Sequence, residues 1–80
     1  MRISFYGRLA EAIAREVELD TPQACAVGEL RARLAELYPQ AASDLISPRV
    51  KSCVGDNIVP DSYVIAPGEA VDILAPLSGG

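Results

Sequence analysis

The first apolar residues of the chain alternate with polar ones, and this alternation predicts a β-strand over residues 3–6. Ile3 and Phe5 fall on one face of this strand. The opposite face carries Ser4 and Tyr6. Successive side chains of a strand point to opposite faces of a sheet, so we expect the first pair to be buried and the second pair to face away from the core.

A second strand is predicted over residues 16–20, where polar and apolar residues again alternate. This pattern turns Val17 and Leu19 inward. The Ala-rich stretch between the two strands, residues 9–14, is compatible with a short helical turn. Residues 21–23 (TPQ) have the chemistry of a turn.

The clearest helix pattern covers residues 27–38. Its apolar stripe consists of Val27, Leu30, Leu34 and Leu37. Its polar side is assigned to Glu29, Arg31, Arg33 and Glu36. The start lacks a Ser or Thr cap, whereas Pro39 disfavours the helical conformation at the residue before it and so marks the end. We expect one amphipathic helix of about 12 residues that buries its apolar stripe.

Three later stretches predict strands that complete a sheet. Residues 49–54 and 58–59 are apolar, β-prone runs, and the sequence Gly-Asp-Asn at 55–57 predicts a tight hairpin turn between them. Residues 70–75 predict the last strand. Residues 41–46 would add one further helical turn after the main helix.

Together these elements predict an α+β domain with a β-grasp (ubiquitin-like) fold over residues 1–76. A mixed sheet of about four to five strands would pack on the one main helix. That helix would join the first two strands to the later ones by a right-handed crossover. A ferredoxin-like domain would need a second long helix, which the sequence does not indicate. Residues 77–80 are interpreted as a flexible C-terminal tail.

Composition and charge narrow the class of partner. The chain has 80 residues, and its 7 basic and 11 acidic residues give a net charge of −4. An acidic chain is a poor match for nucleic acid or an anionic membrane, since both need clustered Lys and Arg. No apolar run approaches the roughly 18 residues of a membrane span. The first residues are too polar for a signal peptide, so we expect a cytoplasmic protein.

A conventional active site is hard to assemble from this sequence. It has no His, which excludes a His base and a His metal ligand. Cys25 and Cys53 lie far apart without zinc-site spacing, and we expect both to be reduced thiols and no metal to bind. Carboxylates such as Glu16 and Glu18 have the spacing of a solvated strand face.

The unusual feature is the C-terminal sequence, which ends in Gly79 and Gly80. Glycine lacks a Cβ atom, so this end of the chain is thin, and the four residues after Pro76 would reach about 13 Å when extended. A narrow channel in a partner would admit it, although simple fraying of a terminus predicts the same sequence. A terminal carboxylate is a poor electrophile, and adenylation by ATP would activate it.

One face of the predicted sheet would present apolar side chains to a partner. Alternation turns Val71 and Ile73 inward, which leaves Leu74 on the same outer face as Tyr6. First and last strands are neighbours in a β-grasp, so the two would form an apolar patch, to which Ile58 would contribute. Scattered surface hydrophobes are the alternative interpretation.

The sequence resembles the small subunit of molybdopterin synthase over essentially its whole length. The similar segments are residues 8–11 (RLAE), 27–30 (VGEL), 67–71 (PGEAV) and 75–80 (APLSGG). The last segment is the most specific, because it looks like the family's Pro-Pro-Val-Ser-Gly-Gly ending.

The resemblance implies a role in molybdenum cofactor biosynthesis. An activating enzyme would adenylate Gly80, and sulfur transfer would convert it to a thiocarboxylate. Leu77, Ser78 and Gly79 would thread the loaded end into the large subunit of the synthase. The thiocarboxylate would then donate sulfur to cyclic pyranopterin monophosphate, so the chain would be the non-catalytic, sulfur-donating subunit of a sulfurtransferase.

The resemblance also implies partners and a contact surface. The partners would be the large subunit, in a heterotetramer, and an ATP-dependent adenylyltransferase or sulfurase. No cofactor would be bound permanently, because the activating enzyme uses the ATP. Tyr6, Ile58 and Leu74 match positions of the family's apolar contact surface.

Three other functions remain open from the sequence. The thiamine-pathway sulfur carrier shares the fold and the Gly-Gly ending, although it is typically shorter. A ubiquitin-like modifier would join Gly80 to lysine side chains by an isopeptide bond. A plain binding module would have an inert tail.

Overall fold

A computed structural model of the chain describes residues 1–20 and 23–76. Its elements follow in the order β1 (Arg2–Tyr6), α1 (Arg8–Ala12), β2 (Glu16–Glu18), β3 (Cys25–Ala26), α2 (Val27–Leu37), the 3-10 helix η1 (Pro39–Ala41), α3 (Ala42–Leu45), β4 (Lys51–Val54), β5 (Asn57–Val59), β6 (Val64–Ile65) and β7 (Val71–Leu74). The strands and helices predicted from the sequence are all found, with bounds that differ by a few residues. The predicted turn at 21–23 lies mostly outside the described residues.

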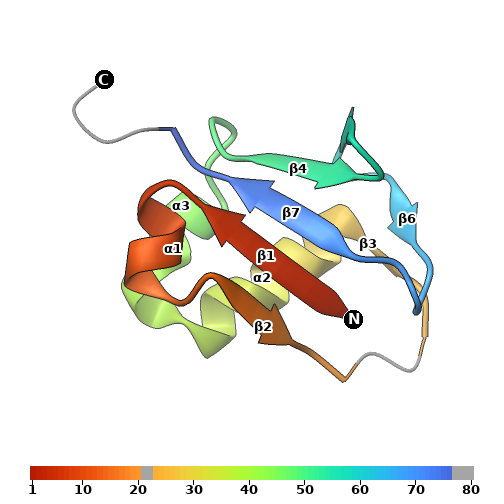
Figure 1. Cartoon of the computed structure of the whole chain (residues 1–80), viewed down its shortest axis with the longest axis horizontal. Coiled ribbons are helices and arrows are strands. Elements are labelled where there is room, and N and C mark those ends of the chain that lie inside the picture. The colour runs from red at the N-terminus through yellow and green to blue at the C-terminus, as the bar shows by residue number, and fades with distance from the viewer. Residues whose placement is uncertain (21–22, 77–80) are drawn as a thin grey trace.

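The first and last strands of the chain are neighbours at the centre of a five-stranded sheet. The strand order is β2-β1-β7-β4-β5, with β1 and β7 parallel and the other pairs antiparallel. Helix α2 lies across one face of this sheet (Figure 1). The prediction of a β-grasp fold, with a mixed sheet packed on one main helix, is confirmed.

The core lies between the sheet and α2. The strands contribute alternate residues to it, as the sequence pattern predicts, and the helices and connections contribute the rest. The most completely buried large side chains are Ile3, Leu9, Leu30, Leu34, Leu45, Ile65 and Ile73. The side chain of Leu19 is buried just beyond the end of β2, whereas Val17 within the strand is half-buried. The sheet face opposite α2 is therefore left for solvent or a partner.

Two residues of α2 depart from the predicted stripe. Arg31 was assigned to the polar side and is 7% exposed, whereas Leu37 was assigned to the core and is 51% exposed. At about 100° per residue, each lies about 60° from Leu34, but on opposite sides of it. Arg31 is buried because the carbonyl oxygens of Leu45 and Ser47 accept hydrogen bonds from its guanidinium group, whereas Leu37 is the last residue of the helix. The prediction was wrong at both positions because it followed residue type, and the contact of α2 with the segment after α3 leaves no signal in the helical pattern.

The start of α2 is satisfied by the backbone of another segment instead of a side-chain cap. The N–H of Val27 donates to the carbonyl oxygen of Tyr63 at 2.8 Å, and that of Gly28 donates to the carbonyl oxygen of Asp61 at 2.9 Å. These bonds use two of the N–H groups that have no partner within a helix. They explain why the sequence carries no cap signal at Ala26.

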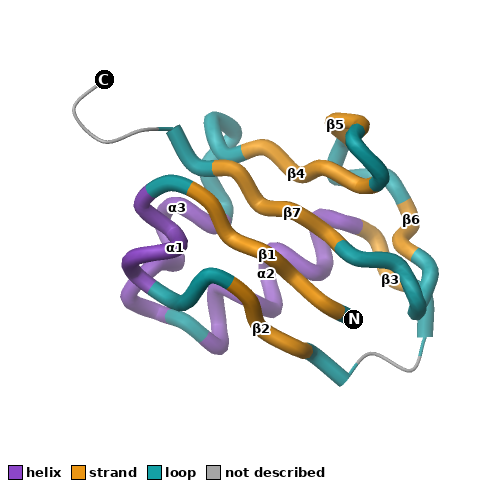
Figure 2. The backbone as a smooth tube through the Cα atoms, in the orientation of Figure 1, coloured by secondary structure: helices purple, strands orange, loops and turns teal. Residues whose placement is uncertain are grey.

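A second, two-stranded sheet was missed by the sequence analysis. Strands β3 and β6 pair antiparallel, with Cys25 opposite Ile65 and Ala26 opposite Val64. Figure 2 shows the two strands together at the end of the molecule where α2 begins. Two-residue strands are too short to show an alternating pattern, so the sequence gives no signal for them.

The predicted hairpin between β4 and β5 is confirmed. Gly55 has φ 57° and Asp56 has φ 69°, and these two residues form the turn. Positive φ at both central residues is the signature of a type I′ turn, whose twist matches that of the flanking strands. Asn57, predicted as part of the turn, instead begins β5.

Candidate functional site

The described chain ends where β7 leaves the centre of the sheet. Leu74, the last residue of β7, is opposite Tyr6 of β1 on one side and opposite Lys51 of β4 on the other. Pro76 follows after one more residue and is exposed. The predicted tail residues Leu77, Ser78, Gly79 and Gly80 lie outside the described residues. The described part of the site consists of the residues around the end of β7.

Gly7 shapes the turn that adjoins the end of β7. Its φ of 69° and ψ of −146° belong to a region that is essentially confined to glycine. A Cβ atom added to Gly7 would lie 2.6 Å from the carbonyl oxygen of Ala75. The N–H of Ala75 in turn donates to the carbonyl oxygen of Tyr6 at 3.4 Å. Glycine at this position therefore lets the residue after β7 lie against the turn between β1 and α1.

Replacing Gly7 with Ala is expected to destabilise the domain at this point. The strained backbone alone would lower the free energy of unfolding by about 1–3 kcal/mol, and the new Cβ would also push Ala75 away. The matched control is Gly68→Ala, because a Cβ at Gly68 meets no atom within 4 Å and the residue has no positive φ. Urea denaturation of both variants measures the difference, and equal stability of the two would contradict this role of Gly7.

The open face of the sheet brings two of the three predicted contact residues together. Tyr6 is 50% exposed and Leu74 is half-buried, and they are paired across β1 and β7. Ile58 is 69% exposed and lies on the same face, because it is opposite Cys53, which is opposite Asp72. Tyr6 and Leu74 therefore form one apolar pair beside the end of β7, while Ile58 is two strands away from it.

A broad depression of about 600 Å³ adjoins this apolar pair. It is lined by Ser4, Phe5, Tyr6, Gly7, Ala10, Arg15 and Glu16. A partner side chain seated there would contact Tyr6 and the turn at Gly7 together. The predicted contact surface is thus continuous with the segment that supports the end of β7.

The surroundings of Cys53 do not activate it as a nucleophile. Both Cys25 and Cys53 are free thiols, as expected from the sequence. Burial raises the pKa of Cys53, and the carboxylates of Asp72 and Asp56 raise it further. A raised pKa keeps this thiol protonated at neutral pH, and the thiolate is the nucleophilic form. Within residues 1–20 and 23–76, no group of three or more His, Cys, Asp or Glu side chains is placed to hold a metal ion.

No helix in the described part of the chain has both the length and the apolar character needed to cross a bilayer.

Comparison with known proteins gives one family and one fold. A sequence profile described as the ThiS family matches residues 3–80, which includes the Gly-Gly ending. A search of curated proteins found no match.

Two solved structures are similar to the chain. One is the crystal structure of SAMP1 from Haloferax volcanii, with a TM-score of 0.83 at 21% identity, covering 99% of this chain and 97% of that one. The other is the crystal structure of H. volcanii small archaeal modifier protein 1, with a TM-score of 0.78 at 19% identity and 95% of each chain covered. At these identities the similarity shows the fold.

Proposed function

Because the chain belongs to the ThiS family of ubiquitin-like sulfur carriers, we propose that its reactive group is the carboxylate of Gly80 and that it is the small subunit of molybdopterin synthase. In this proposal the folded domain presents the C-terminal end, and other proteins supply the catalysis. The chain is then a reactant that receives sulfur at Gly80 and later donates it.

The observation that carries this proposal is the pairing of β7 with a strand on each side, directly before the C-terminal residues. It is paired on both sides, to β1 and to β4, and the chain emerges beyond it at exposed Pro76. Because β7 is hydrogen-bonded to a strand on each side, the position from which the following residues extend is fixed. Four residues that end in Gly79 and Gly80 remain beyond this point. Such an arrangement suits delivery of a terminal carboxylate into a partner's active site.

The chemistry uses the terminus and not the side chains of the domain. The carboxylate oxygen of Gly80 would attack the α-phosphorus of ATP, and pyrophosphate would leave. A sulfide-level sulfur donor would then attack the carbonyl carbon of the adenylate, and AMP would leave with the C–O electron pair. The product is a thiocarboxylate. Its sulfur is a far better nucleophile than a carboxylate oxygen and would attack a carbon of cyclic pyranopterin monophosphate on the large subunit. Water would then cleave the bond between this sulfur and the carbonyl carbon of Gly80, which leaves the sulfur on the pterin and restores the carboxylate.

The apolar surface supports docking to that large subunit. Tyr6 and Leu74 lie directly beside the base of the tail, so a partner that takes in the tail would cover them. Ile58 on the same face would extend the contact. Large apolar and aromatic side chains near the centre of an interface typically contribute most of its binding energy. Two small subunits would bind two large subunits in the heterotetramer that the resemblance implies.

A second candidate is a ubiquitin-like protein modifier that is joined to lysine side chains through Gly80. The observation that favours it is the similarity in fold to a small archaeal modifier protein. Both functions begin with adenylation of the same carboxylate, so they differ in the nucleophile that consumes it. Sulfur leads to a thiocarboxylate, whereas a lysine amine leads to an isopeptide.

Reconstitution with purified partners tests the proposed function. The thiocarboxylate form of the chain is mixed with cyclic pyranopterin monophosphate and a molybdopterin synthase large subunit, and a parallel reaction contains a thiazole synthase with its own substrates. We expect stoichiometric dithiolene formation in the first reaction and none of the thiazole product in the second. Thiazole formation, or lysine conjugates without sulfur transfer, would assign the chain to another pathway.

Titration of the large subunit in the same assay gives the affinity of the complex and so tests the predicted contact surface. Tyr6→Ser should weaken the complex with the large subunit by about 5- to 30-fold, as expected for an aromatic anchor worth about 1–2 kcal/mol. Val64→Ser is the matched control, because Val64 is 60% exposed on β6, in the other sheet. Equal affinities for the two variants would remove Tyr6 from the interface.

A further inference from the structure

Basic side chains surround the point where the chain leaves the sheet. Strands β4 and β7 are antiparallel, and Lys51 at the start of β4 is opposite Leu74 at the end of β7. Arg49 comes two residues before Lys51, at the same end of the sheet. Arg8 begins α1 on the other side of the exit, directly after the turn that packs against the residue following β7. We call Arg8, Arg49 and Lys51 the exit rim.

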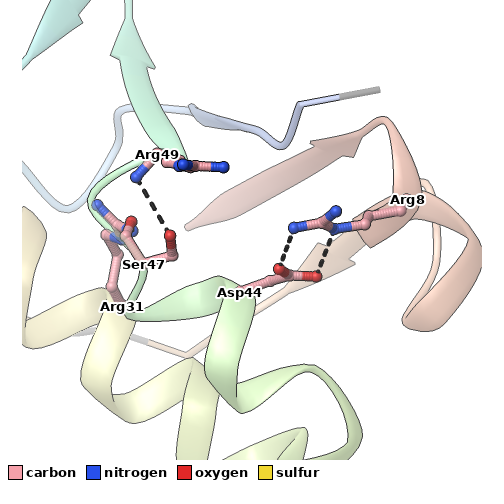
Figure 3. Close-up of polar contacts among 5 residues, drawn as sticks. All are labelled: Arg8, Arg31, Asp44, Ser47 and Arg49. Carbon is pink, nitrogen blue, oxygen red and sulfur yellow. Dashed lines mark hydrogen bonds and ion pairs between the residues drawn. The ribbon is translucent and has the colours of Figure 1, made fainter. Parts of the chain in front are cut away.

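The three rim charges are compensated to different degrees. Arg8 donates two hydrogen bonds to the carboxylate of Asp44, at 2.8 and 2.6 Å, so its charge is largely offset (Figure 3). Arg49 and Lys51 are exposed, and neither takes part in an ion pair with any of residues 1–20 and 23–76. Figure 3 shows the guanidinium group of Arg49 extended toward the side of the Arg8–Asp44 pair. The rim therefore carries two uncompensated positive charges on a chain whose net charge is −4.

The surroundings of the rim favour a protein surface as its partner. Lys51, Leu74 and Tyr6 are successive members of one row across β4, β7 and β1, so the cationic rim continues the apolar pair. A phosphate ligand would need the basic groups to converge in a hollow. The depression that Lys51 lines, of about 380 Å³, contains neither Arg49 nor Arg8, and its other basic residue, Arg31, is paired with Asp61. Because the three charges are not gathered in one hollow, they match carboxylates that are spread over a protein surface.

We propose that Arg49 and Lys51 dock against carboxylate groups on the protein that takes in the tail. This inference rests on the proposed function, because it concerns the partner that receives Gly80. Arg15 and Arg33 are also exposed and take part in no ion pair among the described residues, but they lie singly, whereas Arg49 and Lys51 are two residues apart beside the exit. On an acidic chain, this pair would favour the approach that points the tail at an acidic partner surface. Exposed charges of this kind act mainly on association rate and orientation.

A titration with a synthetic hexaglutamate peptide, followed by amide chemical shifts, tests the rim without any activating enzyme. We expect saturable shifts near Arg8, Arg49, Lys51 and Ala75, and their loss at about 0.3 M salt, where exposed charges are screened. The double variant Arg49→Gln, Lys51→Gln should bind the peptide about 2- to 30-fold more weakly. The double variant Arg2→Gln, Arg33→Gln has the same net charge, changes exposed side chains elsewhere, and should bind like the unmodified chain.

Three results would overturn the proposal. They are equal weakening in the two double variants, shifts centred away from the rim, and tighter binding of tripolyphosphate than of the peptide at the rim. Because the titration uses the folded chain by itself, its outcome is independent of whether Gly80 ever carries sulfur. Failure of the rim and failure of the proposed function are thus distinguishable.

Discussion

Removal of Gly79 and Gly80 is expected to abolish adenylation and sulfur loading completely while leaving the domain folded. In the proposed chemistry the reacting group is the terminal carboxylate of Gly80. Once both glycines are removed, no other residue can present a carboxylate at the same position on an equally thin end of the chain. The core side chains belong to residues 1–73, so the shortened chain should unfold at the same urea concentration as the full chain. ATP–pyrophosphate exchange with the activating enzyme, together with denaturation, measures both effects.

Two further variants distinguish chemistry at Gly80 from a general effect of altering the tail. Ser78→Ala keeps the terminal glycines and should be loaded at a nearly normal rate. One alanine appended after Gly80 keeps every original residue but displaces the carboxylate and adds a Cβ, so loading should be lost. Normal loading of either the shortened or the extended chain would place the reactive group elsewhere.

Replacing Arg31 with Ala is expected to have the largest effect on stability. Its guanidinium group donates to the carbonyl oxygens of Leu45, at 2.7 Å, and Ser47, and its second nitrogen lies 3.2 Å from a carboxylate oxygen of Asp61. Truncation would leave the carbonyl oxygens of buried Leu45 and half-buried Ser47 without this donor and would cost about 2–4 kcal/mol, while the exposed carboxylate of Asp61 would be solvated by water. A chain of this size has a total stability of roughly 4–12 kcal/mol, so the variant would lose a large share of its stability.

Arg33→Ala is the matched control for that substitution. Arg33 lies two residues further along the same helix and is exposed, and its removal changes the net charge equally. Its effect should stay within about 0.5 kcal/mol. Arg31→Lys keeps the charge but cannot reproduce the fork of donors, so it should fall between the two. Similar urea midpoints for Arg31→Ala and Arg33→Ala would contradict the structural role of Arg31.

Arg31 also links the helix to the functional end of the sheet. The bonds to Leu45 and Ser47 fix the segment that leads from α3 into β4, as the position of Arg31 beside Ser47 in Figure 3 illustrates. Arg49 lies in this segment, and its N–H donates to the hydroxyl oxygen of Ser47 at 3.2 Å. An Arg31 variant in which this segment is loosened should therefore lose the peptide response of the exit rim.

The regular part of the fold was predictable because alternation and turn chemistry are local signals. Ile3 and Phe5 in β1, and Val71 and Ile73 in β7, are buried as their spacing predicts. The prediction that these two strands are neighbours followed from recognising the β-grasp order. Tyr6 and Leu74 came together for the same reason, since the faces of both strands were set by the pattern.

The features that escaped prediction depend on contacts between distant segments. The strain at Gly7 arises because Ala75 lies 2.6 Å from where its Cβ would be, a contact made 68 residues later in the chain. Arg31 is buried because backbone carbonyls of residues 45 and 47 accept its hydrogen bonds. The exit rim likewise joins Arg8 to residues 49 and 51 through the sheet. None of these pairings leaves a periodic trace in the sequence.

The central claim is that the chain carries sulfur as a thiocarboxylate at Gly80, and the mass of the native protein tests this claim most directly. The chain is purified from its own organism without reducing agents and measured intact, and its fragments are then sequenced from the C-terminus. We predict a population heavier by one oxygen-to-sulfur exchange, with the whole difference confined to the fragment that ends in Gly80. An unmodified Gly80 in every molecule, with the extra mass absent or on Cys25 or Cys53, would contradict it.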